Sequence, residues 1–240
     1  DPVWANSLGH AGRQGAATEL AVVARDRLYR LPAGVDPELA VAVAHPAVTA
    51  YLGWFLRARI RPGWTVFVGG GAGNVGIAAI EMATRAGVRV IASARDDHAD
   101  RCRAAGAQAV VDYRAADLAE RIRSAAPNGV DVYWDTSGTN DTAVAADVLR
   151  PGGRMLVTAA RSPVTVNLAP LYTHDVTIDG FVISRASAAE FAQAAELINA
   201  MLAAGELTTR ITDRLPLAQA AQAHARMESG PVDGRLLLLV

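Results

Sequence analysis

Three regularly spaced glycines give the sequence its clearest sign of chemistry. Gly70, Gly73 and Gly76 form a G-x-x-G-x-x-G run between a predicted strand, 65–68, and a predicted helix, 75–86. Glycines at such a junction let the backbone turn tightly and approach a pyrophosphate, whose negative charge a helix N-terminus favours. Because the strand and helix supply the context that the motif requires, the run predicts a dinucleotide site rather than a merely structural turn.

The end of the next predicted strand, 88–92, indicates which dinucleotide binds. Enzymes that use NAD usually place Asp or Glu there, about 20 residues after the turn, to hold the ribose hydroxyls. This sequence has the small Ala94 at that place, followed by Arg95, whose guanidinium suits a 2′-phosphate. We therefore expect NADPH, with NADH as the alternative if Asp96 or Asp97 holds the ribose instead.

Composition excludes several other kinds of chemistry. The 240 residues are 51% hydrophobic and 20% charged, as in globular proteins. All 23 basic residues are Arg, which excludes active sites that depend on a lysine, such as Tyr-x-x-x-Lys. A net charge of −1 argues against nucleic acid as a partner. Cys102 is the single cysteine, which excludes disulfides within the chain and multi-cysteine zinc sites.

Neither membrane insertion nor export is expected from the sequence. Apolar runs such as 66–68 and 236–240 are far shorter than the roughly 18 residues that a membrane span needs. The chain does not open with a basic segment followed by an apolar one, as a signal peptide does. Together with the single cysteine, this predicts a cytoplasmic protein with no membrane partner.

Alternating strands and helices surround the glycine turn and determine the expected fold. Beyond the two strands already named, the sequence predicts strands over 109–111, 130–134, 155–158 and 177–183, and helices over 118–125 and 143–149. Alternation at this spacing is typical of a parallel, doubly wound sheet of the α/β class.

The segments on either side of this region are of a different kind. The first 45 residues contain short β-like pieces, such as 21–24, among Gly, Asn and Pro. A helix is expected to start at Asp36-Pro37 and to run toward Arg59, with an interruption at Pro46. A strongly periodic helix is predicted over 187–204, followed by strand, helix and strand.

The glycine turn and several other stretches resemble those of a known family. Residues 66–76, VFVGGGAGNVG, resemble the cofactor turn of the zeta-crystallin-like quinone oxidoreductases, the zinc-free branch of the medium-chain dehydrogenase/reductase superfamily. Further matching stretches lie at 31–32, 46–51, 112–114, 129–132, 149–154 and 234–235.

The resemblance implies a Rossmann-type doubly wound parallel sheet over 46–205 that binds NADPH. It implies that 1–45 and 206–240 form the remnant of a GroES-like, β-rich catalytic domain, with the active site in the cleft between the domains. Asp1 to Trp4 resemble a strand well inside that domain of the family, so we expect roughly the first quarter of a typical member to be absent from this sequence.

The resemblance also implies which residues hold the cofactor. Those facing the phosphates are Ala72, Gly73, Asn74 and Val75, within the glycine turn. Those around the adenosine are Ser93 and Arg95, at the 2′-phosphate, and Tyr113. Those around the nicotinamide are Thr49, the segment Thr158, Ala159, Ala160 and Arg161, and the segment Phe181, Val182 and Ile183. Helix capping is the alternative role for Thr49, and packing is the alternative for Tyr113, Phe181 and Ile183.

For activity, the resemblance implies hydride transfer from NADPH to a quinone or an α,β-unsaturated carbonyl. No side chain is identified as a catalytic acid or base, which fits a quinone that solvent protonates. His45 stands where zinc-dependent relatives carry a ligand, but a lone histidine does not predict a metal site. The alternatives are a zinc-free enoyl or enone reductase, an alcohol dehydrogenase if His45 binds zinc, and an NADPH-binding protein without catalysis. The stretch from Thr177 to Ile183 resembles the edge strand through which family members form homodimers.

Overall fold

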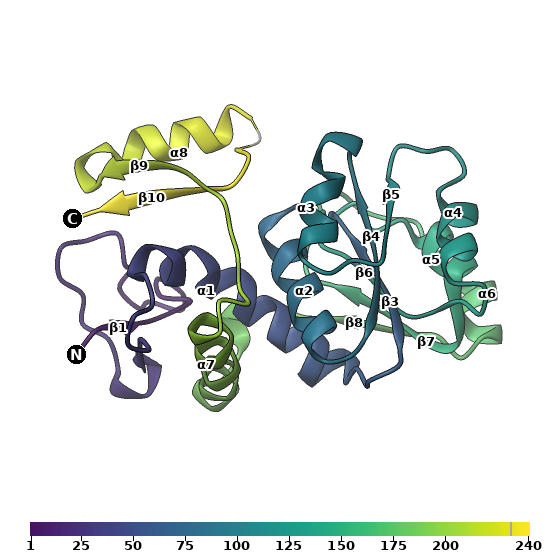
Figure 1. Cartoon of the computed structure of the whole chain (residues 1–240), viewed down its shortest axis with the longest axis horizontal. Helices are drawn as coiled ribbons and strands as arrows, with labels where there is room; N and C mark the ends of the chain where they lie inside the picture. The colour runs from purple at the N-terminus through teal and green to yellow at the C-terminus, as the bar shows by residue number, and fades with distance from the viewer. Residues whose placement is uncertain (231) are drawn as a thin grey trace. The chain divides into compact units, whose positions relative to one another are not determined.

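The structure, a computed structural model, describes residues 1–230 and 232–240 of the chain (Figure 1). It divides into two compact units. Unit 1 consists of Asp1–Val48 and Ile183–Val240, and unit 2 consists of Thr49–Val182. The predicted nucleotide-binding domain, 46–205, extends further than unit 2 at its C-terminal end, because helix α7 (Ala188–Ala203) belongs to unit 1.

Unit 2 is built on a six-stranded sheet in which all neighbouring strands are parallel. The strand order is β5-β4-β3-β6-β7-β8, which is the order of a doubly wound dinucleotide-binding fold. The expected α/β class with a parallel doubly wound sheet is therefore confirmed. The strands are β3 (Thr65–Gly69), β4 (Arg89–Ala94), β5 (Ala109–Asp112), β6 (Val130–Asp135), β7 (Leu149–Val157) and β8 (Thr177–Gly180).

Helices connect these strands and cover both faces of the sheet. In Figure 1, α2 and α3 lie on one face, and α4 and α5 lie on the other. This arrangement buries the apolar side chains of the central strands on both sides, so these strands form near-continuous apolar runs. The helices of unit 2 after β3 are α2 (Asn74–Arg85), α3 (Ala99–Ala104), α4 (Leu118–Ala125), α5 (Thr142–Val148) and α6 (Leu168–Thr173).

Aromatic side chains pack on both faces of the sheet. Phe67 of β3 stacks on Tyr133 of β6, with ring centroids 4.8 Å apart, in the core that the sheet shares with α4 and α5. Trp54 meets Trp134 edge to face, with centroids 4.7 Å apart, and its Nε1 donates a hydrogen bond of 2.8 Å to the carbonyl oxygen of Ala79 in α2. Because this packing fixes α2, it also fixes the turn between β3 and α2.

The helix that begins at Pro37 is not interrupted at Pro46, contrary to the prediction. α1 (Pro37–Tyr51) passes through Pro46 and continues as a π-helical segment, η2 (Leu52–Ala58). It ends at Arg59, which has a φ of 52°. Residues 46–50 are all buried, so the packing of this stretch offsets the hydrogen bond that a proline cannot donate.

Length and composition alone would allow the stretch Pro37–Ala58 to cross a membrane, with a mean hydropathy of 1.5. A search for uninterrupted apolar runs does not find this stretch, because polar and charged residues divide it. However, 67% of its most apolar window is buried inside the structure, as in the core helix of a globular protein.

Unit 1 contains two small sheets. β1 (Val3–Trp4) pairs antiparallel with β2 (Tyr29–Arg30), and β9 (Ile211–Pro216) pairs parallel with β10 (Arg235–Leu239). Helix α8 (Ala220–Glu228) lies between β9 and β10 in the chain. The β-like piece expected at 21–24 is an irregular segment and not a strand.

Hydrogen bonds explain why α7 belongs to unit 1. The helix begins with a capping box, in which Ser187 Oγ accepts from Glu190 N and Glu190 Oε2 accepts from Ser187 N, at 3.2 and 2.7 Å. Further along α7, Asn199 accepts a bond from Trp4 Nε1 and donates one to the carbonyl oxygen of Arg30, both at 2.9 Å. These bonds tie α7 to β1 and β2.

Candidate dinucleotide-binding site

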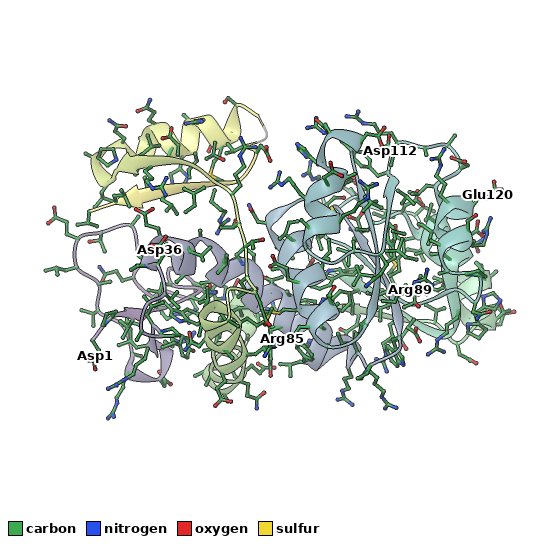
Figure 2. All side chains as sticks on the ribbon, in the orientation of Figure 1. Asp1, Asp36, Arg85, Arg89, Asp112 and Glu120 are labelled. Atoms are coloured by element: carbon green, nitrogen blue, oxygen red, sulfur yellow. The ribbon has the colours of Figure 1, made fainter. Side chains whose placement is uncertain are left out.

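The candidate site lies where the carboxyl ends of the parallel strands meet. β3 has β4 on one side and β6 on the other, so the order of the sheet reverses there. Ligands of doubly wound sheets bind in the crevice at this switch point. Asp112 is the last residue of β5 and lies at the carboxyl edge, whereas Arg89 is the first residue of β4 and lies at the opposite edge (Figure 2). The predicted cofactor residues at the ends of β3, β4, β5 and β7 therefore share one edge of the sheet.

The glycine turn joins β3 to the N-terminus of α2. Gly70 has a φ of 66°, which residues with side chains rarely adopt, and its carbonyl oxygen accepts a 2.9 Å hydrogen bond from Gly73 N. A Cβ on Gly76 would collide with the carbonyl oxygens of Gly70 and Gly71. Glycine at position 76 thus allows α2 to begin this close to the turn.

The first turn of α2 is suited to an anion. Gly73 is the N-cap residue and supplies no side-chain hydrogen bond to the helix. Asn74, Val75 and Gly76 follow it, and the N–H groups of a first helical turn have no acceptor within the helix. Their partial positive charge favours a phosphate, which supports the role predicted for them and for Ala72 in the preceding turn.

β4 supports the glycine turn from the side. Gly71 N donates to the carbonyl oxygen of Ser93 at 2.8 Å, and Gly70 N donates to Ser93 Oγ at 3.4 Å. Ser93 is only 2% exposed, and its hydroxyl bonds to the turn, so its contact with a 2′-phosphate remains a prediction. Beneath Gly71 lies Cys102, whose burial raises the pKa of its thiol to about 11. Cys102 is therefore protonated at neutral pH and acts in packing.

The end of β4 carries a cation in place of the acid typical of NAD enzymes. Ala94 is buried, and the side chain of Arg95, directly after it, is 42% exposed. Arg95 Nη2 lies 3.1 Å from Asp97 Oδ2 and 3.2 Å from His98 Nε2. Asp97 thus forms an ion pair with the guanidinium of Arg95. Tyr113 follows the neighbouring strand β5 and is about half exposed, so its ring is accessible to a ligand at the same edge.

The loop after β6 forms a hydrogen-bond network that sequence reasoning missed. The two carboxylate oxygens of Asp135 accept from Ser137 N and from Asn140 N, both at 2.7 Å. Asn140 is 2% exposed, has a φ of 51°, and donates its Nδ2 hydrogen to the carbonyl oxygen of Ala159 at 2.7 Å. The signal for it in the sequence is an acid at the end of a buried strand, followed by the turn-forming run TSGTN.

This loop also reaches the glycine turn and the end of β7. Thr136 donates from both N and Oγ1 to the carbonyl oxygen of Gly69, at 3.0 and 2.8 Å. Arg161 N donates to the carbonyl oxygen of Gly138 at 3.1 Å, and Arg161 Nε donates to that of Ser137 at 2.9 Å. The loop therefore joins the predicted phosphate-binding turn to the segment predicted to face the nicotinamide.

The remaining nicotinamide candidates lie in different surroundings. Thr158 Oγ1 accepts a 3.1 Å bond from Trp134 Nε1, and Ala159 and Ala160 are exposed. Phe181 N donates to the carbonyl oxygen of Val157 at 3.0 Å, although β8 ends at Gly180, earlier than predicted. Val182 is exposed, and Ile183 begins the short η4 (Ile183–Arg185) of unit 1. Thr49 is buried inside α1 and does not cap its end.

His45 is not part of a metal-ligand cluster. Within residues 1–230 and 232–240, no group of three or more His, Cys, Asp or Glu side chains could hold a metal ion. The ring of His45 instead has its Nδ1 3.2 Å from Asn6 Oδ1. Because zinc sites normally use three or four protein ligands, we derive no step through zinc.

Comparison with known proteins agrees with this architecture. The family model described as zinc-binding dehydrogenase matches residues 74–200, which is more than half of the chain. The quinone oxidoreductase of Sus scrofa is 29% identical over 229 residues, and the alignment covers 94% of this chain and 70% of that protein.

Solved structures give the same result. The quinone oxidoreductase of Thermus thermophilus, whose structure was solved alone and with NADPH, is 28% identical, with a TM-score of 0.78 over 90% of this chain and 70% of that one. An NAD-dependent alcohol dehydrogenase is also 28% identical, with a TM-score of 0.85 over 97% of this chain and 67% of that one. The chain therefore belongs to the zinc-binding dehydrogenase family of oxidoreductases, in the group that contains the quinone oxidoreductases.

Proposed function

We propose that this protein is a cytoplasmic, zinc-free oxidoreductase that transfers hydride from NADPH to a quinone or an α,β-unsaturated carbonyl. The observation that carries the proposal is the glycine turn at the N-terminus of α2, with Arg95 at the end of the neighbouring strand. The turn accounts for a dinucleotide, and the cation accounts for the additional phosphate of NADPH.

The residues at the sheet edge fit NADPH. The close approach of Gly76 to the turn leaves no space for a Cβ, so the backbone itself forms the cradle for the pyrophosphate, at Ala72, Gly73, Asn74 and Val75. Arg95 would hold the 2′-phosphate by exchanging its ion pair with Asp97 for one with the ligand. When bound, NADPH supplies the hydride.

The chain's own contribution is positioning. The loop held by Asp135 and Asn140 would orient the backbone of Ala159, Ala160 and Arg161 against the nicotinamide, together with Phe181 and Val182. We assign no catalytic acid or base, because the oxygen of a reduced quinone takes its proton from solvent. Thr49, Ser93, Tyr113 and Ile183 remain predicted cofactor contacts.

Replacing Arg95 by alanine is expected to weaken NADPH binding about 10- to 100-fold, since it removes a charge-assisted contact with the 2′-phosphate. NADH lacks that phosphate, so its affinity stays the same. Fluorescence titration of each nucleotide measures both constants. Arg89→Ala, an exposed arginine at the opposite end of the same strand, is the matched control and leaves both affinities unchanged. Equal weakening of NADPH and NADH by Arg95→Ala would contradict the proposed role.

We further propose that the protein forms a homodimer through β8. This strand is at the edge of the sheet, and Ile178 on it is 44% exposed. Unpaired backbone groups on an edge strand readily pair with a second copy. Ile178→Lys is expected to convert the dimer to a monomer in size-exclusion chromatography with light scattering. Val22→Lys, at an exposed residue outside the sheet, leaves the dimer intact. A wild-type protein that is monomeric at micromolar concentration would contradict the proposal.

A further inference from the structure

The buried indole of Trp134 contacts both segments that are predicted to face the nicotinamide. Trp134 is in β6, and its Nε1 donates a 3.1 Å hydrogen bond to Oγ1 of Thr158, directly after β7. Its ring also meets that of Phe181, directly after β8, with centroids 6.0 Å apart. All three residues belong to unit 2. One side chain therefore touches the ends of two neighbouring strands at the carboxyl edge of the sheet.

The strand register explains why these side chains meet. Trp134 pairs with Leu156 of β7, and Leu156 pairs with Asp179 of β8. Side chains alternate between the two faces along a strand. Thr158 and Phe181, each two residues further on, are therefore placed on the same face as Trp134, and the two contacts above bear this out.

Packing on its other sides fixes the indole of Trp134, which is 0% exposed. Trp54 meets its ring edge to face, and a Cβ on Gly53 would collide with the same ring. Gly53 and Trp54 belong to η2, which is held in turn by the hydrogen bond from Trp54 to α2. Because the ring cannot turn, the direction of its N–H is fixed as well.

The fixed N–H determines what the hydroxyl of Thr158 can do. An indole nitrogen only donates, whereas a hydroxyl has one hydrogen to donate and two lone pairs to accept. Thr158 therefore accepts from Trp134 and keeps its own hydrogen for a second partner. Within residues 1–230 and 232–240, no such partner is present. Because Thr158 is partly exposed at the edge of the sheet, a ligand can supply the acceptor.

The nicotinamide ring carries an acceptor that suits this hydrogen. Its carboxamide has a carbonyl oxygen, which accepts, and an NH₂ group, which donates. A hydroxyl that has already accepted from an indole is the better donor to that oxygen, because hydrogen bonds in a chain polarise one another. The half-buried ring of Phe181 offers apolar surface to the nicotinamide ring beside Thr158.

We propose that Trp134 is a positioning residue for the cofactor. Its N–H makes the Thr158 hydroxyl a donor to the carboxamide oxygen of the nicotinamide, which fixes the orientation of that ring. Trp134 itself does not touch the cofactor and acts only through Thr158. This inference rests on the proposed function, in which NADPH binds at this edge of the sheet.

The first test compares NADPH with 2′-phospho-ADP-ribose, which lacks the nicotinamide, by isothermal titration calorimetry. Thr158→Val removes the hydroxyl and keeps the shape of the side chain. It is expected to weaken NADPH binding about tenfold and to leave 2′-phospho-ADP-ribose binding unchanged. Thr158→Ser keeps the hydroxyl and is expected to bind both ligands as the wild type does. Unaltered NADPH binding by Thr158→Val, or equal weakening of both ligands, would overturn the assignment.

The second test asks whether Trp134 acts through Thr158. Trp134→Phe removes the N–H and is expected to weaken NADPH binding about 3- to 10-fold, with no effect on 2′-phospho-ADP-ribose. The double variant with Thr158→Val is expected to lose no more than Thr158→Val alone, because two residues that serve one contact are not additive. Additive losses would overturn the positioning role.

Two further measurements support this test. Trp64→Phe is the matched control, at a partly exposed tryptophan before β3 at the opposite edge of the sheet, and it changes neither affinity. In the wild type, NADPH is expected to move the indole N–H resonance of Trp134 in the NMR spectrum, whereas 2′-phospho-ADP-ribose leaves it in place. An unmoved resonance with NADPH would overturn the role of Trp134 even if Trp134→Phe does not fold.

The two proposals fail in different ways. If the glycine turn does not bind the cofactor, the wild type binds neither NADPH nor 2′-phospho-ADP-ribose, and both proposals are overturned. If this inference alone is wrong, the wild type binds both ligands and oxidises NADPH, while Thr158→Val leaves both affinities unchanged.

Discussion

Replacing Gly76 by alanine is expected to weaken NADPH binding by at least about 100-fold and to destabilise the protein by about 1–3 kcal/mol. The added Cβ would overlap the carbonyl oxygens of Gly70 and Gly71. These are backbone atoms and cannot rotate away, so either α2 or the turn must move. Both belong to the cradle for the pyrophosphate. Fluorescence titration with NADPH and thermal unfolding measure the two effects.

Gly15→Ala is the matched control for this change. It adds the same methyl group where nothing lies within 4 Å, and it is expected to leave NADPH affinity unaltered. An unchanged affinity in the Gly76→Ala variant would show that the turn is structural only, which is the alternative that the sequence left open.

Replacing Asp135 by alanine is expected to have the second largest effect on stability and on NADPH binding. The variant leaves the N–H groups of Ser137 and Asn140 without the carboxylate that accepts from them, and each buried N–H without an acceptor costs about 1–3 kcal/mol. The free energy of unfolding therefore falls by about 2–6 kcal/mol. NADPH affinity falls about tenfold or more, because Asn140 no longer fixes Ala159 at the end of β7.

Asp141→Ala is the control that distinguishes the loss of this network from a general loss of helix stability. Asp141 is exposed and caps α5 by accepting from Ala143 N and Val144 N. Its loss is expected to cost about 1 kcal/mol, the usual value for an N-cap, without an effect on NADPH binding. If Asp135→Ala binds NADPH as the wild type does, the loop after β6 has no part in positioning the cofactor.

Periodicity and turn chemistry predicted the sheet of unit 2 well. The prediction for 118–125 coincides with α4, and that for 109–111 is one residue short of β5. Such elements are specified locally, by a run of β-branched residues or an amphipathic face next to a glycine. β7 starts at Leu149, well before the predicted 155, because Leu149 already pairs with Val130 of β6. The Pro-Gly-Gly run, which local rules assign to a turn, lies at an irregularity between this pair and the next one, Val132 with Arg154.

Tertiary packing determines the features that local sequence rules did not predict. Pro46 is a helix breaker in isolation, but it lies within a buried stretch of α1. In the candidate site, the glycine turn and Arg95 were predictable because backbone freedom and charge are local properties. The network around Asp135 and Asn140 was not, since Gly69 and Ala159, to which this loop donates, lie on two other segments that only the folded sheet brings together.

The most direct test of the proposed function is the anaerobic oxidation of NADPH by a quinone, followed by the loss of absorbance at 340 nm. In this reaction NADPH, a proton and the quinone give NADP⁺ and the hydroquinone. We expect the purified protein to oxidise NADPH in proportion to menadione added, and to oxidise NADH far more slowly. Tight binding of NADPH without its oxidation by quinones or by enones such as cyclohexenone would contradict the proposed activity and favour a nucleotide-binding protein without catalysis. Faster oxidation of NADH would contradict the role of Arg95.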